Sequence, residues 1–373
     1  MVFLRPDNLK PMELAGIIKK RIYNEGPISF YDFMEMALYY PGLGYYTGPK
    51  DKIGRTGDFF TSPNLTHAFG AMIGKQLEEM WRLMGEGEFT IVEYGAGTGA
   101  LCADILNYLK NNPEMYDQVH YAIIERSPAM RALEKERVNE KVTWYNSIED
   151  IAPVTGCVLS NELLDNLSVH RVVMEDELME VFVDDHDGFI EVLKPASAEL
   201  KNYLEELNIE LPRGYKTEIS LEATEWIAGI AASLKKGFVL TIDYGFQSAE
   251  MYKPHRGEGT LLCYKGHRIN DNFYQDIGMQ DITAHVNFTA LCHWGLKNGL
   301  GCCGLVNQAN FLLALGIKNY MRETATQGAN IAELAMQEAM LTRTLLVEMG
   351  GKFKVLIQQK GMYGHPLSGL SLY

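Results

Sequence analysis

The sequence contains no Cys-x-x-Cys pair, no long apolar run and comparatively few basic residues. Its six cysteines lack the spacing of a zinc-knuckle site or a disulfide framework, so we expect buried, reduced thiols. No apolar run approaches the ~20 residues that a membrane-spanning helix needs, and the N-terminus lacks the apolar core of a signal peptide. These absences predict a soluble, cytoplasmic protein without a membrane span. The cysteines are Cys102, Cys157, Cys263, Cys292, Cys302 and Cys303.

The balance of charge limits the partners. There are 48 acidic residues against 34 basic ones, which gives a net charge of −14. Non-specific binding to nucleic acid depends on basic surfaces, so we expect no nucleic-acid partner. A basic segment of another protein, such as one that carries arginine, is compatible with this charge. His-Glu-x-x-His, P-loop and Gly-x-Ser-x-Gly motifs are also missing, so the sequence predicts no metal site, phosphoryl transfer or serine-hydrolase chemistry.

A glycine-rich turn after an apolar strand, at residues 89–99, is the stretch around which the chain is organised. The strand leads into Gly95, Gly97 and Gly99, and residues 101–109 continue at helical spacing. Strand, glycine turn and helix form the nucleotide-binding corner of an open α/β sheet. Glycine is needed because the turn uses backbone angles that other residues resist and because the ligand approaches the backbone closely.

Two acidic residues indicate which nucleotide binds. The spacing is Gly-x-Gly-x-Gly rather than the Gly-x-Gly-x-x-Gly of dinucleotide folds, and Glu93 lies two residues before the first glycine, where it would repel a diphosphate. An acid there suits S-adenosylmethionine, which carries an ammonium and a sulfonium but no phosphate. Glu125 ends the next expected strand and can accept hydrogen bonds from both ribose hydroxyls. A tight turn with an ordinary strand-end carboxylate is the structural alternative.

Alternating strand-like and helical patterns after residue 86 predict an α/β domain with a mainly parallel, Rossmann-like sheet and right-handed crossovers. Three short strand-like runs between residues 169 and 193 predict an inserted antiparallel meander. We therefore divide the chain into an N-terminal helical region with an active-site loop (1–85) and an α/β domain (86–373), with an insertion at about 166–235. Residues 246–280 are expected to form a glycine- and histidine-rich loop.

Polar residues after the fourth expected strand form the predicted substrate side. Asn161, Glu162 and Asp165 should open on the same sheet edge as the glycine turn. Glu162 and Asp165 are three residues apart, so a helical turn would place them on one face. Two carboxylates can hold a guanidinium through charge-assisted hydrogen bonds. A helix N-terminus, which favours acids, is the alternative explanation for Asp165.

Two further regions carry candidate residues. His285 could take up a proton or hold a substrate group, although a histidine beside an apolar strand can equally be structural. Asp58 and Thr61 lie in a polar loop that precedes a core-facing helical pattern. Ordering such a loop costs entropy that a binding site could justify, so both are candidates for the cofactor site.

Four stretches of the sequence, in this order, resemble the MidA-like family of S-adenosylmethionine-dependent methyltransferases. They are Gly-Asp-Phe-Phe-Thr-Ser-Pro at 57–63, Glu-Tyr-Gly-Ala-Gly-Thr-Gly at 93–99, Asn-Glu-Leu-Leu-Asp-Asn-Leu at 161–167 and Asp-Ile-Thr-Ala-His-Val-Asn-Phe at 281–288. The resemblance runs from about residue 10 to the last strand and implies a class I methyltransferase fold with an N-terminal helical extension. Mitochondrial members of this family assist assembly of respiratory complex I and symmetrically dimethylate an arginine of one of its subunits.

The resemblance also implies roles for individual residues. Residues of the glycine motif would bind the cofactor, Glu125 would hold its ribose, and the loop at 57–63 would close over the site. Asn161, Glu162 and Asp165 would face the substrate, with Asn161 also counted among the cofactor-binding residues. The glycine-motif residues concerned are Glu93, Gly95, Gly97 and Gly99.

We therefore expect an S-adenosylmethionine-dependent methyltransferase that acts on an arginine side chain of a protein, of the complex I assembly type. Glu162, Asp165 and His285 are its expected catalytic residues. One alternative is methylation of a small molecule or of another side chain, and a second is a cofactor-binding assembly factor with little turnover. Glu93 and the glycine spacing oppose a nucleotide-dependent oxidoreductase. The sequence leaves open whether the chain forms a homodimer.

Overall fold

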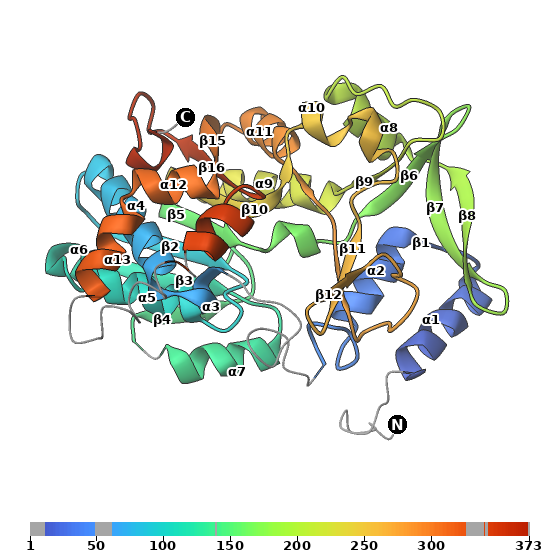
Figure 1. The fold of residues 1–373 in the computed structure, drawn as a ribbon, viewed down its shortest axis with the longest axis horizontal. Coiled ribbons are helices and arrows are strands. Elements are labelled where there is room, and N and C mark those ends of the chain that lie inside the picture. The colour runs from blue at the N-terminus through green and yellow to red at the C-terminus, as the bar shows by residue number, and fades with distance from the viewer. Residues whose placement is uncertain (1–11, 49–61, 139, 326–338, 340–341, 372–373) are drawn as a thin grey trace. The chain divides into compact units, whose positions relative to one another are not determined.

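The computed structural model describes residues 12–48, 62–138, 140–325, 339 and 342–371. The chain forms two compact units, each assembled from three segments. The sheet unit comprises residues 60–164, 226–245 and 291–373. The meander unit comprises residues 1–59, 165–225 and 246–290. The predicted boundary at residue 85 stays a prediction, whereas helix α4, which precedes it, belongs to the sheet unit (Figure 1).

The sheet unit is built on one large sheet with the strand order β15-β16-β10-β5-β2-β3-β4. Strands β10, β5, β2, β3 and β4 run parallel, and β16 runs antiparallel to both β10 and β15. The mainly parallel sheet predicted from the sequence is therefore confirmed. The strands are β2 (Phe89–Tyr94), β3 (Val119–Ile124), β4 (Val142–Tyr145), β5 (Val154–Asn161), β10 (Leu234–Phe246), β15 (Gly301–Asn307) and β16 (Phe353–Lys360).

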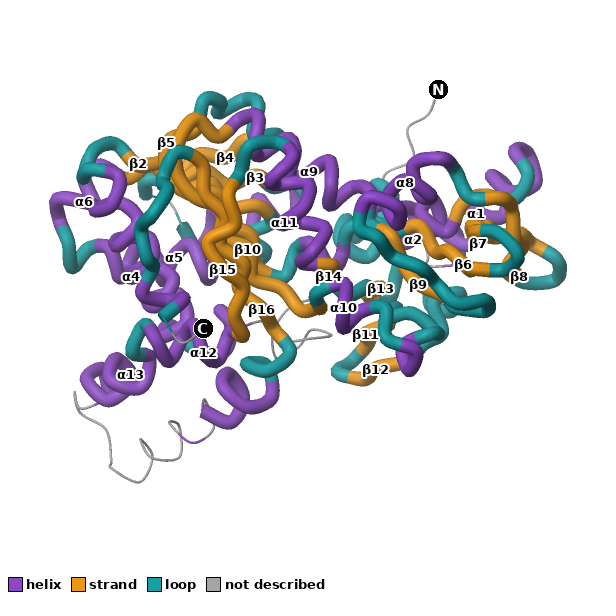
Figure 2. Tube along the Cα trace, turned by 90° about the horizontal axis from the view of Figure 1, so that it is seen from above, coloured by secondary structure: helices purple, strands orange, loops and turns teal. Residues whose placement is uncertain are grey.

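Helices cover both faces of this sheet, with α4 and α5 on one side of the strands and α9 and α11 on the other (Figure 2). On the second face, the ring of Trp226 in α9 packs edge-on against Tyr94 at 5.6 Å. The helices are α3 (Ser62–Leu65), α4 (His67–Met84), α5 (Ala100–Leu109), α6 (Pro113–Gln118), α7 (Pro128–Arg137), α9 (Leu221–Ser233), α11 (Phe288–Lys297), α12 (Gln308–Ala314) and α13 (Ile317–Ala325).

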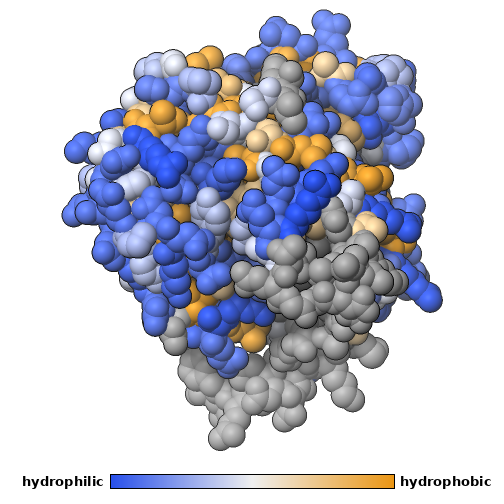
Figure 3. All heavy atoms as spheres, turned by 60° about the vertical axis from the view of Figure 1, so that its left-hand side comes forward, coloured by the Kyte–Doolittle hydropathy of each residue, from blue (hydrophilic) through white to orange (hydrophobic). Residues whose placement is uncertain are grey.

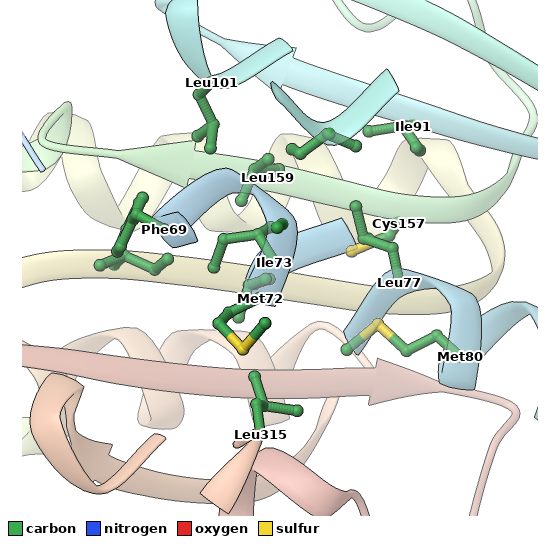
Figure 4. Close-up of a cluster of buried hydrophobic side chains, with 14 of the residues drawn as sticks. Phe69, Met72, Ile73, Leu77, Met80, Ile91, Leu101, Cys157, Leu159 and Leu315 are labelled. Carbon is green, nitrogen blue, oxygen red and sulfur yellow. The ribbon is translucent and has the colours of Figure 1, made fainter. Parts of the chain in front are cut away.

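Helix α4 supplies much of the core because its apolar residues recur at helical spacing. Phe69, Ile73 and Leu77 are completely buried and point at the sheet, against Cys157 and Leu159 of β5 (Figure 4). Burying each large side chain contributes about 1.5–3 kcal/mol. Thr66 caps the N-terminus of the helix, and Gly85 ends it in the left-handed region that favours glycine. The core-facing helix predicted over this stretch is confirmed.

The meander unit contains an antiparallel sheet with the order β1-β7-β6-β9, with β8 paired to β7. The predicted antiparallel runs correspond to its strands β6, β7 and β8. The elements of this sheet are β1 (Ile28–Ser29), β6 (His170–Met174), β7 (Leu178–Asp185), β8 (Phe189–Pro195) and β9 (Lys216–Ile219). The accompanying helices are α1 (Met12–Glu25), α2 (Phe30–Tyr39), α8 (Ala198–Glu206) and α10 (Ser248–Met251).

The prediction that residues 246–280 form only a loop is wrong. This region contributes two strands to a small sheet with the order β12-β11-β13. Its hairpin turns at Gly266 and His267, which both have positive φ, and this geometry matches the right-handed twist of paired strands. A Gly-His turn lacks the usual Asn-Gly signal, so the sequence pattern hid it. The strands are β11 (Leu262–Lys265), β12 (Arg268–Asn270) and β13 (Asp281–Thr283), and β14 (Val286–Asn287) follows.

The cysteines also differ from expectation. Cys102, Cys157 and Cys263 are buried as predicted, but Cys292, Cys302 and Cys303 are partly or fully exposed. The last two lie on β15, which is the edge strand of the large sheet. No helix among the described residues is long and apolar enough to cross a membrane.

Candidate functional site

The glycine turn at the end of β2 requires its glycines. Gly95, Gly97 and Gly99 have φ values of 63°, 58° and 72°, which side chains rarely tolerate. The amide of Gly95 donates to the carbonyl of Ile124 over 3.0 Å, which ties the turn to the end of β3. A Cβ atom at Gly99 would lie 3.3 Å from the Cα atom of Glu134 in α7. The turn therefore brings bare backbone to the carboxyl edge of the sheet, as a nucleotide site needs.

Glu93 lies in β2, two residues before Gly95 and on the same side of the strand as Ile91, which packs with α4 and α5. Its side chain is 2% exposed and accepts a hydrogen bond of 2.7 Å from the hydroxyl of Tyr121. Burial raises the pKa of Glu93 to about 7, although the Tyr121 hydrogen bond lowers it. The carboxyl group is thus only partly charged at neutral pH. Glu93 therefore repels a diphosphate less strongly than the sequence suggests.

Glu125 follows β3 immediately and is half-buried. Its carboxylate accepts a hydrogen bond of 2.6 Å from the amide of Ser127, the N-cap residue of α7. Arg131 of the same helix donates to the backbone carbonyl of Glu125 over 2.7 Å. These contacts hold the residue at the strand end, one position after the carbonyl that binds the glycine turn.

Asn161 and Glu162 come at the end of β5, which pairs with β2 so that Ser160 is opposite Tyr94. The Asn161 side-chain amide donates to the Glu162 carboxylate over 3.2 Å, and its Oδ1 atom is buried without a hydrogen-bond partner among the described residues. Such an orphaned acceptor costs free energy unless a ligand satisfies it. An ammonium or hydroxyl donor of a bound cofactor would do so. The polar residues at this edge therefore fit the predicted cofactor.

Glu162 is held in place from two sides. Its φ of 52° is unusual for a residue with a side chain, and its amide donates to the carbonyl of Ile242 over 2.9 Å. Its carboxylate accepts a hydrogen bond of 3.2 Å from the amide of Ser62. Ser62 belongs to the Gly-Asp-Phe-Phe-Thr-Ser-Pro stretch, so two of the four familiar stretches meet here. Strained backbone of this kind is frequent at functional sites.

Asp243, near the end of β10, is a residue that the sequence reasoning missed. It is buried, and its Oδ2 atom accepts hydrogen bonds from the amides of Leu163 and Leu164, at 3.2 and 2.9 Å. Its Oδ1 atom accepts a third from Tyr244. Asp243 thus shapes the turn that carries Glu162. Its only signal in the sequence is an acid at the end of an apolar strand.

Asp165 belongs to the meander unit, where it lies close to the Asp-Ile-Thr-Ala-His stretch. Its backbone carbonyl accepts a hydrogen bond of 2.9 Å from Ala284. The next residue, Asn166, donates to the Asp281 carboxylate over 3.1 Å, and Tyr46 donates to the same group over 3.0 Å. Burial and the nearby Asp165 raise the pKa of Asp281 to about 8. The structure therefore joins two stretches that lie more than 100 residues apart.

His285 follows directly. Its amide donates to the hydroxyl of Thr260 over 3.1 Å, and its ring packs against Phe246 with centroids 5.0 Å apart. These contacts fix its backbone and ring without assigning it a chemical role. Asp58 and Thr61 lie outside the described residues. No cluster of three or more potential metal ligands is found among the residues that the structure describes.

Glu134 is a second residue that sequence reasoning missed. It is completely buried in α7 behind the glycine turn, and one carboxyl oxygen accepts a hydrogen bond of 2.7 Å from the indole of Trp144. The other oxygen has no hydrogen-bond partner among the described residues. Burial, assisted by the negative charge of Glu125, raises the pKa of Glu134 to about 8.

The profile of the S-adenosyl-L-methionine-dependent methyltransferase family Methyltransf_28 matches residues 72–306. The chain is 27% identical to the protein arginine methyltransferase NDUFAF7 homolog, mitochondrial, of Drosophila melanogaster, over 96% of this chain and 88% of that protein. It is 28% identical to the Caenorhabditis elegans homolog, over 94% of this chain and 88% of that protein.

A solved structure matches the whole fold. The crystal structure of a superfamily member from Burkholderia thailandensis, bound to S-adenosyl-homocysteine, superimposes with a TM-score of 0.88. It is 31% identical and covers 100% of this chain and 98% of its own.

Proposed function

We propose that this chain, which belongs to the Methyltransf_28 family and is an S-adenosylmethionine-dependent methyltransferase, transfers the methyl group to an arginine side chain of a protein. The likeness to the Burkholderia thailandensis structure confirms the predicted class I methyltransferase fold and the predicted cofactor. The resemblance drawn from the four sequence stretches is confirmed by the family match. An oxidoreductase is thereby set aside.

One observation carries the proposal for arginine. Glu162, which is held in strained backbone at the carboxyl end of β5, places a carboxylate beside the orphaned oxygen of Asn161. A carboxylate at the cofactor edge suits a cationic acceptor, and a guanidinium binds carboxylates through charge-assisted hydrogen bonds. The relatives named as arginine methyltransferases support this choice at 27–28% identity. The net charge of −14 favours basic protein segments.

The cofactor would be held by the glycine turn, with Glu125 toward its ribose and Asn161 toward its amino-acid portion. When bound, it supplies an electrophilic methyl group on a sulfonium. The chain's own residues must then orient the acceptor nitrogen in line with that methyl and receive a proton. These tasks need no covalent intermediate with the protein.

Glu162 and Asp165 are the residues we assign to these tasks. The helical turn predicted from Glu162 to Asp165 does not form, because Glu162 has a φ of 52° and the short 3-10 helix covers only Leu164–Asn166. The two residues lie three positions apart in the chain, and their carboxylates would accept hydrogen bonds from the guanidinium and aim one nitrogen. The pKa of arginine above 12 means that its proton leaves during or after methyl transfer, when one carboxylate can accept it. His285 or Asn161 would help to orient the acceptor.

Methylation of a small molecule or of another side chain is the alternative reaction.

An assembly factor with little turnover would instead call for an apolar docking area on the meander. Ile190 and Leu193 of β8 are exposed there, but they are three residues apart and point to opposite faces of the strand. Figure 3 brings forward the left-hand side of Figure 1 and so does not bear on β8; on that face, hydrophobic residues are interspersed among hydrophilic ones. A link to complex I and a cytoplasmic location stay predictions.

Transfer of an isotopically labelled methyl group tests the proposal. The full chain, or its Glu162→Gln variant, is incubated with methyl-deuterated S-adenosylmethionine and a heat-treated protein extract, and modified residues are identified by mass spectrometry. We expect deuterated methyl groups on arginine with the wild type only. Label on another residue type, or only on small molecules, would overturn the arginine assignment.

A further inference from the structure

Two partly exposed cysteines of the sheet unit lie against each other. The Sγ atoms of Cys292 in α11 and Cys302 in β15 are 3.3 Å apart. Cys302 is remote from the glycine turn in the sheet order, because β15 is the edge strand beyond β16 and β10, whereas the turn follows β2. The pair therefore has no part in the methyl-transfer site.

The surrounding structure holds the two thiols in register. Cys302 is opposite Gln358 of β16, and the side chain of Gln358 donates a hydrogen bond of 3.2 Å to the carbonyl of Leu291, the neighbour of Cys292. Gly295 allows this close approach, because a Cβ atom there would lie 2.1 Å from the Gln358 amide nitrogen. One buried glutamine thus fixes both the helix and the strand. The thiols meet through the fold and not through a mobile surface loop.

We propose that Cys292 and Cys302 form a reversible thiol–disulfide pair that closes by exchange with low-molecular-weight disulfides such as oxidised glutathione. A bonded pair needs its sulfurs about 2.05 Å apart, so side-chain rotation must bring the sulfurs roughly 1.3 Å closer than in the reduced form. Such a movement is small for side chains that are not packed on every side.

The surroundings of the two thiols determine which of them attacks the external disulfide first. Cys302 is exposed, and the hydrogen bond from the Cys292 thiol lowers the pKa of Cys302 below its ordinary value. Its thiolate attacks the external disulfide, forms a mixed disulfide and releases one thiolate of the reagent. Cys292 then loses its proton and attacks the Cys302 sulfur, which releases the second reagent thiol. In sum, two protein thiols and one external disulfide give one protein disulfide and two external thiols.

Cys303 provides an internal comparison. It follows Cys302 directly but occupies a bulge in the β15–β16 pairing, is half-buried and packs against the core. Burial raises the pKa of Cys303 to about 11, so it reacts slowly as a nucleophile. We expect it to stay reduced under conditions that oxidise its neighbour.

Peptide mapping tests the proposal on the full chain. The protein is incubated with graded ratios of oxidised to reduced glutathione, and free thiols are alkylated at low pH before trypsin digestion. Lys297 lies between the two cysteines, so trypsin yields separate peptides 269–297 and 298–318 that stay joined only through a disulfide. We expect this joined pair within one chain, lighter by two hydrogens than the reduced peptides together, and its loss on reduction.

Three variants decide between outcomes. Cys303→Ser should leave the joined pair unchanged, and Cys302→Ser should abolish it. Cys292→Ser removes the resolving thiol, so glutathione should accumulate on Cys302 at about tenfold the wild-type level or more. A joined pair that requires Cys303, a link between two chains, or wild-type protein that carries only glutathione or no modification would each overturn the proposal.

Discussion

The amide of Ser62 donates a hydrogen bond of 3.2 Å to the carboxylate of Glu162, across 100 residues of sequence. This contact joins the end of the Gly-Asp-Phe-Phe-Thr-Ser-Pro stretch to the residue that we assign to the methyl acceptor. It positions the Glu162 carboxylate from the backbone of another segment. The side chain is therefore aimed before any substrate arrives, which reduces the cost of orienting it.

Replacing Glu162 by Gln should therefore affect turnover more than cofactor binding. Gln keeps an oxygen that can accept from Ser62 but loses the negative charge that binds a guanidinium and receives its proton. We expect the rate of S-adenosyl-homocysteine release with an arginine acceptor to fall by about 100-fold or more, with the affinity for S-adenosylmethionine unchanged. Glu86→Gln is the matched control, because Glu86 also has positive φ but lies at the surface, directly after the C-cap residue of α4. Equal activity of the Glu162→Gln variant and wild type would remove Glu162 from the reaction.

Asp243 should be important for stability as well as for the site. Asn in its place has one side-chain oxygen, whereas Asp243 accepts from three amides, so at least one amide would face an NH2 group. We expect Asp243→Asn to lower the free energy of unfolding in urea by about 1–3 kcal/mol. It should also weaken methyl transfer, because the turn that carries Glu162 loosens.

Asp184→Asn supplies the comparison for this measurement. Asp184 likewise accepts from the following amide, but it is only half-buried and lies in the meander unit. We expect a smaller loss of stability and full activity. If both variants unfold at the same urea concentration as the wild type, Asp243 does not support the turn.

The buried carboxyl of Glu134 predicts a dependence of stability on pH. Its pKa rises from an ordinary value of 4.5 to about 8 on folding, so between these values the folded chain binds more protons than the unfolded chain. The contribution of Glu134 to the free energy of unfolding is therefore fully present below pH 4.5. It is lost as the pH rises toward 8, by at most about 1.4 kcal/mol per pH unit.

Glu134→Gln tests this directly, since glutamine can keep the hydrogen bond from Trp144 without titrating. Unfolding free energies measured from pH 5 to 8.5 should fall less steeply for this variant than for the wild type. Glu136→Gln, an exposed change on the same helix, should reproduce the wild-type slope. Parallel slopes for all three proteins would show that Glu134 does not titrate differently on folding.

Local patterns predicted much of the fold. The glycine turn and helix α4 were predictable because positive φ and helical apolar spacing are properties of a short stretch. The parallel order of the first strands followed from the alternation of strands and helices. The hairpin of β11 and β12 was missed because Gly266 and His267 lack the usual turn sequence.

The rest depended on contacts between distant residues. Asp243 acquires its role only because β10 pairs with β5, and no local pattern reports that pairing. The partial protonation of Glu93 arises from burial beside Tyr121, 28 residues away. The prediction that Cys292 and Cys302 are buried was wrong. Their exposure depends on the position of β15 at the edge of the sheet, which no local pattern in the sequence reports.

Calorimetric titration with S-adenosylmethionine is the most direct test of where the cofactor binds. We predict micromolar binding to the wild type, loss of binding in Gly97→Val, and weakening of about tenfold or more in Glu125→Ala, which removes the ribose acceptor. Gly85→Val is the control: it also forces a side chain into positive φ, but at the end of α4, so it should cost stability and leave the affinity intact. Wild-type affinity in both Gly97→Val and Glu125→Ala would contradict the account, because the cofactor would then bind away from the glycine turn.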